Sequence, residues 1–147
     1  MAEPMYSAHG HVDGGRRAGH GRTSDGKLDV ELDLPAELGG KGAGTNPEQL
    51  FAVGYGACFL ESLKSTGRRH GLRVDEATID SDVDLVKREG GGFGLGVALR
   101  VSLPTLDREQ AERLVAAADE RCPYSNALRG NVDVHLQVQD TLVGTGS

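Results

Sequence analysis

Two cysteines, Cys58 and Cys122, are the residues of this chain with the most informative chemistry. The first residues lack the charged and apolar segments of a secretory leader, so we expect a cytoplasmic protein. In that reducing compartment, two cysteines are reactive or simply buried more often than they form a permanent bridge. Each lies on the apolar side of a predicted helix, and two inward-facing thiols suit an attacking and a resolving cysteine.

An attacking thiol needs a nearby cation, because burial raises the pKa of a cysteine and leaves it neutral and unreactive. Arg16 and Arg17 follow a Gly-Gly turn and are the two candidates. The carboxylate of Glu48 is suited to hold one guanidinium group in a fixed fork geometry. Glu48 also suits a simple helix-dipole role in a first turn, and the residues alone leave both interpretations open.

Other uses of these side chains are less well supported. The five histidines form no Cys-His pairing with structural-zinc spacing, so we expect no metal site. We interpret them as surface or strand residues: His9, His11, His20, His70 and His135. The glycine-rich loop over residues 38–44 lacks the GK[ST] ending of a P-loop, which argues against nucleotide binding.

Cys58 lies in a segment that predicts a long central helix. Asn46 is a favourable N-cap, Pro47 suits the first helical position, and Gln49 completes a capping-box pattern. Gly67 is the expected C-terminal stop. This helix is the element that must position the first thiol.

The interior of this helix is apolar nearly all round. Within residues 50–63 only Glu61 and Ser62 are clearly polar, which predicts a helix inside the protein. Gly54, Gly56 and the acidic residues interrupt the segment, so it is not predicted to span a membrane.

Alternating apolar and polar residues predict strands on both sides of the helix. Three are expected before it, over residues 6–12, 16–23 and 28–34, and a hairpin follows over 77–86 and 95–103. Asp107 and Gln110 form a second capping box, and the helix that follows carries Cys122 on its buried face before Pro123 ends it. A last strand is expected over residues 131–139. This order predicts an α+β fold, with antiparallel sheets packed on the central helix in one domain over residues 1–147.

The net charge of −6, with acidic and basic residues interspersed, provides no basic stripe. Nucleic acid is therefore not an expected partner.

Several motifs occur in order between Tyr6 and Val138. They are Gly14-Gly15-Arg16, Ser24-Asp25-Gly26-Lys27-Leu28, Leu38-Gly39-Gly40, Asn46-Pro47-Glu48-Gln49-Leu50-Phe51, Gly54-Tyr55, Ala57-Cys58-Phe59, Cys122-Pro123-Tyr124-Ser125-Asn126 and Arg129-Gly130-Asn131. This pattern resembles the organic hydroperoxide resistance proteins, which are thiol peroxidases of the OsmC family. The resemblance implies Cys58 as peroxidatic cysteine, Cys122 as resolving cysteine, Arg16 as the activating cation and Glu48 as its partner.

The resemblance also implies the reaction. Cys58 is expected to reduce an organic hydroperoxide and to become a sulfenic acid, which condenses with Cys122 to a disulfide. The family implies regeneration by dihydrolipoyl groups of a lipoylated protein, with no bound cofactor. An apolar surround favours alkyl or fatty-acid hydroperoxides. Its expected members are Phe51, Tyr55, Phe59 and Tyr124.

Two other classes of function use the same residues. A thiol redox sensor would need a basic helix or a docking tail, and the chain has neither. A non-catalytic carrier of apolar ligands would leave both thiols as packing groups.

If Glu48 and Cys58 belong to one site, helix geometry predicts a homodimer, and the family resemblance implies that its two chains are intertwined. Glu48 and Cys58 are ten residues apart, so on one helix they lie about 15 Å apart along the axis. One arginine can hardly serve both. A twofold dimer with antiparallel central helices would bring Glu48 of one chain to Cys58 of the other.

Overall fold

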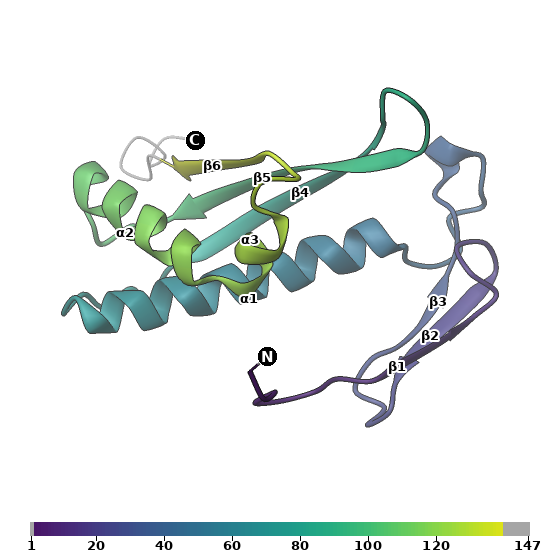
Figure 1. The fold of residues 1–147 in the computed structure, drawn as a ribbon, viewed down its shortest axis with the longest axis horizontal. Coiled ribbons are helices and arrows are strands. Elements are labelled where there is room, and N and C mark those ends of the chain that lie inside the picture. The colour runs from purple at the N-terminus through teal and green to yellow at the C-terminus, as the bar shows by residue number, and fades with distance from the viewer. Residues whose placement is uncertain (1, 140–147) are drawn as a thin grey trace. The chain divides into compact units, whose positions relative to one another are not determined.

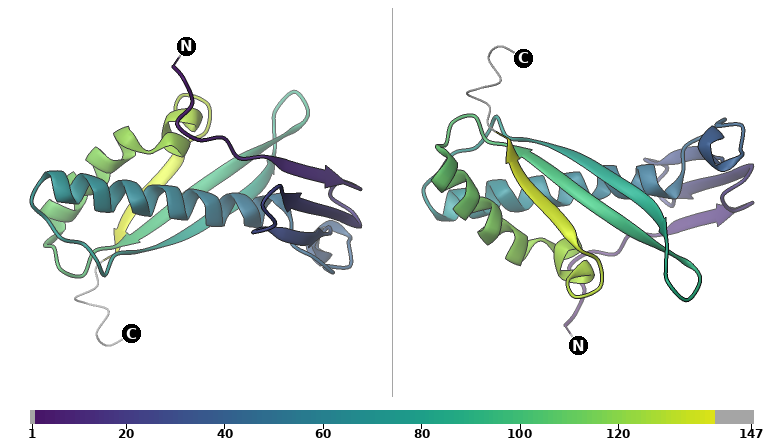
Figure 2. Two further views of the ribbon diagram at one scale, coloured as in Figure 1. Left: turned by 90° about the horizontal axis from the view of Figure 1, so that it is seen from below. Right: turned by 90° about the horizontal axis from the view of Figure 1, so that it is seen from above.

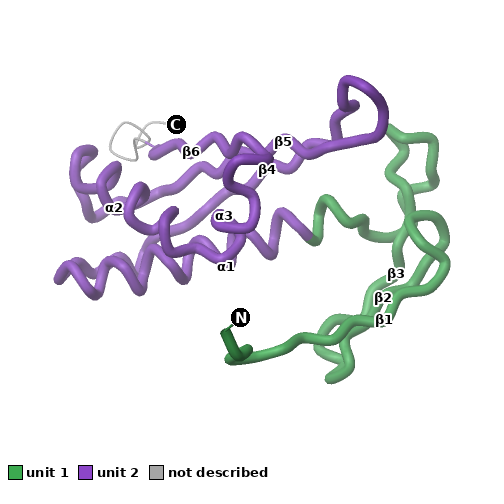
Figure 3. Tube along the Cα trace, in the orientation of Figure 1, with its two compact units in different colours: residues 1–50 green, residues 51–147 purple. Residues whose placement is uncertain are grey.

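The computed structural model describes residues 2–139, and these divide into two compact units. Unit 1 is Met1–Leu50 and unit 2 is Phe51–Ser147 (Figure 3). Each unit is described by itself below. The expectation of one domain over residues 1–147 stays a prediction.

Unit 1 is built on a three-stranded antiparallel sheet in the order β1-β2-β3 (Figure 1). The strands are β1 (Gly10–Asp13), β2 (Gly19–Thr23) and β3 (Asp29–Leu32). The predicted Ser-Asp-Gly turn joins β2 to β3, with Gly26 at φ 75°. Among the hydrophobic residues within 2–50 only Leu32 is buried, so the sheet has almost no core of its own.

The segment after β3 leads the chain into the central helix. A short 3-10 helix, η1 (Ala36–Leu38), is followed by Thr45, which forms an isolated parallel bridge with Leu32. Asn46 then caps α1 (Pro47–Arg69), because its Oδ1 accepts a hydrogen bond from the amide of Gln49 at 2.9 Å. The Gln49 side chain does not complete the predicted capping box; its Oε1 accepts from the Thr45 hydroxyl at 2.6 Å.

The predicted stop of this helix at Gly67 is wrong. The helix continues to Arg69, and Gly71 ends it with φ 74°. The amide of Leu72 donates to the Gly67 carbonyl, and the amide of Gly71 donates to the Arg68 carbonyl. These are the two bonds of a Schellman motif, which requires a left-handed residue at Gly71 rather than at Gly67.

Unit 2 contains a second three-stranded sheet in the order β4-β5-β6. The predicted hairpin is confirmed as β4 (Thr78–Lys87) and β5 (Phe93–Ser102), paired antiparallel. The last strand, β6 (Val134–Gln139), lies parallel to β5, so this sheet is mixed rather than wholly antiparallel. Parallel pairing follows from the helical crossover between β5 and β6.

That crossover contains two helices where the sequence predicted one. They are α2 (Arg108–Arg121) and α3 (Pro123–Leu128). Asp107 caps α2, since its Oδ1 accepts from the Gln110 amide at 2.8 Å. Pro123 ends α2 as predicted, and it also begins α3, because proline suits a first helical position.

The core of unit 2 lies between the sheet and the helices. α1 and α2 lie on the same face of the sheet in both views of Figure 2. The buried hydrophobic cluster includes Tyr55, Phe59, Leu63, Val97, Leu99, Val101, Ala111, Leu114, Val115, Ala118 and Cys122. The prediction that α1 is buried on every side does not hold within one chain, because Val53 is 74% exposed.

Candidate active site

The two thiols lie side by side within unit 2. Cys58 is on α1, and Cys122 is the residue that joins α2 to α3. Their sulfur atoms are 3.5 Å apart, with the Cys122 thiol donating to Cys58, and both cysteines are free. A disulfide needs about 2.05 Å. The pair is therefore a reduced dithiol that a small movement would bring to bonding distance.

The position of Cys122 is fixed by hydrogen bonds around the end of α2. Its amide donates to the carbonyl of Ala118 at 3.0 Å. The same carbonyl accepts from the buried hydroxyl of Ser62 on α1 at 2.7 Å. The last turn of α2 is thus tied to the helix that carries Cys58.

A second tie joins α1 to α3. The hydroxyls of Tyr55 and Ser125 are 2.6 Å apart, and both residues are buried. Tyr55 also stacks on Tyr124, with ring centroids 5.7 Å apart. Burial raises the pKa of Tyr55, so its phenol stays protonated and can donate. Sequence reasoning quoted Ser125 in a motif and Ser62 as a polar exception, but gave neither a role.

Burial raises the pKa of the Cys58 thiol. The backbone amide of Tyr124 opposes this shift, while the neighbouring Cys122 adds to it. Within residues 51–139, no cationic side chain lowers this pKa. Unit 2 therefore supplies the thiol pair but leaves Cys58 in its neutral form.

Unit 1 contains the candidate cation. The Arg16 guanidinium donates two parallel hydrogen bonds to the Glu48 carboxylate, at 2.9 and 2.8 Å. This bidentate pair fixes the plane of the guanidinium group. Arg16 holds the pKa of Glu48 below its usual range, mainly through these hydrogen bonds and against the effect of burial. Arg16, and not Arg17, is the residue paired with Glu48.

The four aromatic residues expected to contact substrate form one cluster, but they differ in exposure. Tyr55 contacts the rings of Phe51, Phe59 and Tyr124, and Phe51 also lies edge-on to Tyr124. Tyr55 and Phe59 are fully buried, whereas Tyr124 is exposed and Phe51 is partly buried. Within this cluster, Phe51 and Tyr124 therefore have the surface that a ligand can reach.

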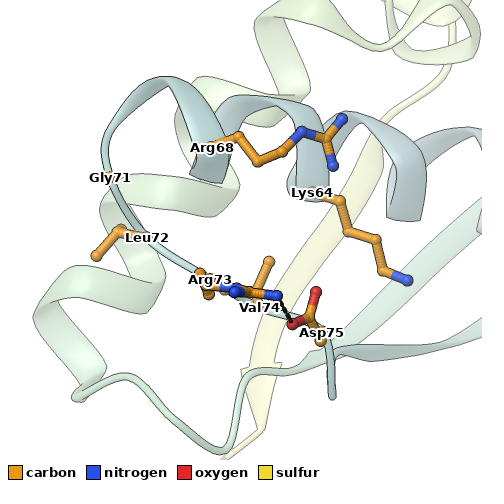
Figure 4. A pocket seen from close by; sticks show the side chains of 7 residues that line it. All are labelled: Lys64, Arg68, Gly71, Leu72, Arg73, Val74 and Asp75. Atoms are coloured by element: carbon orange, nitrogen blue, oxygen red, sulfur yellow. Dashed lines mark hydrogen bonds and ion pairs between the residues drawn. The ribbon is translucent and has the colours of Figure 1, made fainter.

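A surface pocket of 490 Å³ lies at the C-terminal end of α1, and neither thiol lines it (Figure 4). Its walls carry Lys64, Arg68 and the Arg73–Asp75 ion pair. Among residues 2–139, no group of three His, Cys, Asp or Glu side chains is arranged to hold a metal ion. No helix in that described part of the chain is long and apolar enough to cross a membrane.

Comparison with known proteins identifies the family of the chain. Residues 40–137 match the family described as OsmC-like protein. The chain belongs to this family. It is 47% identical to the organic hydroperoxide resistance protein of Xanthomonas axonopodis pv. citri, over 92% of this chain and 98% of that one. The match places it among the organic hydroperoxide resistance proteins.

Solved structures of family members have the same fold. The organic hydroperoxide resistance protein of Legionella pneumophila superposes with a TM-score of 0.89 at 45% identity, covering 93% of this chain and 99% of that one. A Vibrio cholerae homologue has captopril bound in one of its active sites, with a TM-score of 0.89, 40% identity and 94% coverage of both chains. The α+β architecture expected from the sequence is confirmed by these structures.

The Tyr55–Ser125 bond should stabilise the contact between α1 and α3. Ser125→Ala leaves the buried Tyr55 hydroxyl without a partner, so we expect it to lower the free energy of unfolding by about 1–3 kcal/mol. Urea unfolding of Ser125→Ala, Tyr55→Phe and the double variant measures the coupling. A double variant as unstable as the sum of the two single variants would contradict this bond.

The Arg16–Glu48 pair should be visible in the titration of Glu48. Its pKa is lowered in the folded state, so the stabilisation is present above the ordinary carboxyl pKa of about 4.3 and lost as pH falls through the folded value. Arg16→Ala should raise the Glu48 pKa, because the effect of burial is then opposed only by the hydrogen bond from the Glu48 backbone amide. Arg17→Ala is the matched control and should leave it low. Carboxyl carbon NMR measures each titration, and a rise with Arg17→Ala would reverse the assignment.

Proposed function

We propose that this protein is a cysteine-based peroxidase that reduces organic hydroperoxides to alcohols. The observation that carries the proposal is the free thiol pair at 3.5 Å, in a chain of the organic hydroperoxide resistance family. A pair of thiols at this spacing suits two-step redox chemistry better than packing alone. The protein would act in the defence of the cytoplasm against oxidative stress.

The reaction begins at Cys58. Its thiolate attacks the terminal oxygen of the hydroperoxide, the O–O bond breaks, and the alkoxide takes a proton and leaves as an alcohol. Cys58 is then a sulfenic acid. The Cys122 sulfur attacks the Cys58 sulfur, the oxygen leaves as water, and a disulfide forms. Because Cys122 is already adjacent, this step competes well with a second peroxide that would overoxidise Cys58.

An external dithiol must restore the thiols. Dithiol exchange opens the Cys58–Cys122 disulfide through a mixed disulfide, and the second sulfur of the reductant completes the transfer. We propose a dihydrolipoyl group on a lipoylated protein as this reductant. Phe51, whose ring packs edge-on to that of Tyr124, contacts the same hydrophobic core as Cys58 and Cys122, and this aromatic surface favours alkyl or fatty-acid hydroperoxides over hydrated hydrogen peroxide.

Arg16 is proposed as the cation that stabilises the Cys58 thiolate, with Glu48 holding its guanidinium plane. Among residues 51–139 no cationic side chain lowers the pKa of Cys58, so a neutral thiol would react slowly without Arg16. Removing Arg16 would then slow the first oxidation far more than removing Arg17.

We further propose that the active form is a homodimer with two shared sites. The exposed Val53 lines an apolar groove of 380 Å³ along α1, with Ala57 and Leu60 beside it. The sheet of unit 1 also lacks a covering layer within that unit. A second copy of the chain would cover these apolar surfaces and combine Glu48 of one protomer with Cys58 of the other.

The roles of the two cysteines can be separated by kinetics. Cys58→Ser should abolish turnover of tert-butyl hydroperoxide, because the attacking sulfur is gone. Cys122→Ser should permit one rapid oxidation and then fail with dithiols as peroxide rises. Stopped-flow single turnover and steady-state assays with dithiol and monothiol reductants measure both. Equal loss of the first oxidation in both variants would contradict these roles, and absence of turnover in the wild type would favour a redox sensor or a carrier.

Shared sites predict complementation between two inactive chains. Glu48→Ala and Cys58→Ser are each expected to be poorly active alone. When the two are unfolded and refolded together, half of the heterodimer sites receive both native residues, so turnover should reappear. Refolding each variant with itself is the control. Sites made from one chain would give no recovery, even where light scattering shows a dimer.

A further inference from the structure

The turn that carries Arg16 has a strained backbone. It joins β1 to β2, and Gly14 and Gly15 both have positive φ angles, 75° and 76°. Ala18 has φ 53° and is the one non-glycine residue with a positive φ among residues 2–139. An alanine rarely adopts this left-handed conformation unless its surroundings impose it. Something must therefore hold Ala18 in place.

The turn is also tightly folded on itself. A Cβ atom at Gly19 would lie 2.1 Å from the carbonyl oxygen of Gly15, so only glycine fits there. This close approach limits the conformations that can present Arg16. It does not by itself fix Ala18, whose amide points to a carboxylate outside the turn.

Asp33 is that carboxylate. It follows the last residue of β3 and is only 7% exposed. Its Oδ1 accepts a hydrogen bond from the Ala18 amide at 3.4 Å, and its Oδ2 accepts from the Ala43 amide at 3.1 Å. The Asp33 amide in turn donates to the carbonyl of Thr45 at 2.9 Å. One buried side chain thus joins the Arg16 turn to the segment that enters α1.

The Arg16–Glu48 ion pair lies close to the two segments that Asp33 joins. Arg16 comes two residues before Ala18, and Glu48 comes three residues after Thr45. The Ala43 hydrogen bond is the main cause of a lowered pKa at Asp33, with smaller contributions from the amides of Leu34 and Ala18 and from the charge of Arg17. Asp33 is accordingly an ionised acceptor at neutral pH, which suits it to two amide donors.

We propose that Asp33 is a positioning residue, which clamps the Arg16 turn to the start of α1 so that the Arg16 guanidinium meets Glu48. Its part in catalysis rests on the proposed function, since it acts only through Arg16. Its effect on the turn is independent of the proposed function, because the conformation of the turn can be measured without any peroxide.

Asp33→Asn tests the clamp with almost no change in size. In asparagine an NH2 donor replaces one of the two carboxylate oxygens, so either the Ala18 amide or the Ala43 amide loses the oxygen that it bonds to. We expect trypsin to cleave after Arg16 and Arg17 about tenfold faster or more, because the turn opens more often. We also expect the Glu48 pKa, followed by carboxyl carbon NMR, to rise as it loses Arg16.

Asp25→Asn is the matched control. Asp25 lies in the other hairpin turn of the same sheet and also accepts from a backbone amide, that of Lys27 at 3.0 Å. It should change neither the cleavage after Arg16 nor the Glu48 pKa. Ala18→Gly combined with Asp33→Asn should restore part of the Glu48 shift, since glycine adopts the positive φ without help.

Unchanged cleavage and an unchanged Glu48 pKa in folded Asp33→Asn would overturn the proposal. If that variant does not fold, hydrogen exchange in the wild type decides: the clamp requires slow exchange at both Ala18 and Ala43, and rapid exchange at Ala18 overturns it. Single-turnover oxidation of Cys58 is measured separately. A freed turn with undiminished oxidation would confirm the clamp and overturn the catalytic role of Arg16.

Discussion

The cost of ionising a buried thiol is the constraint on which the proposed chemistry depends. Cys58 lies in an apolar core that raises its pKa, yet a peroxidase needs its thiolate. The nearby amide of Tyr124 lowers the pKa but does not outweigh burial. In the proposed chemistry the positive charge comes from Arg16, whose guanidinium plane is fixed by Glu48 within unit 1.

The same apolar core that suppresses ionisation would favour the second step of the proposed reaction. Two hydrogen bonds from α1 flank Cys122. Ser62 bonds to the Ala118 carbonyl on the α2 side, and Tyr55 bonds to the Ser125 hydroxyl on the α3 side. Cys122 is fully buried, so it is shielded from external oxidants while it contacts Cys58.

Local signals made much of this fold predictable. The caps at Asn46 and Asp107, the hairpin of β4 and β5, and the stop at Pro123 depend on neighbouring residues, and each was found. The thiol pair was predicted from the two helices and from the family motifs. Gly67 was mistaken for a stop because the sequence does not show which glycine has a positive φ. The parallel pairing of β6 depends on contacts far apart in the chain, which local patterns do not encode.

Asp33 shows why the supporting residues of a site escape sequence reasoning. An aspartate at the end of a strand beside a proline-containing loop is an ordinary turn residue, and nothing in its neighbours indicates a partner at Ala18, fifteen residues earlier. Only the folded backbone brings a strained alanine, a loop amide and one buried carboxylate together. An arginine on a glycine-rich turn has many accessible positions, and the bond from the Ala18 amide to Asp33 limits them. The motifs therefore point to the groups proposed to react, whereas the folded chain shows the hydrogen bonds that join the Arg16 turn to Asp33.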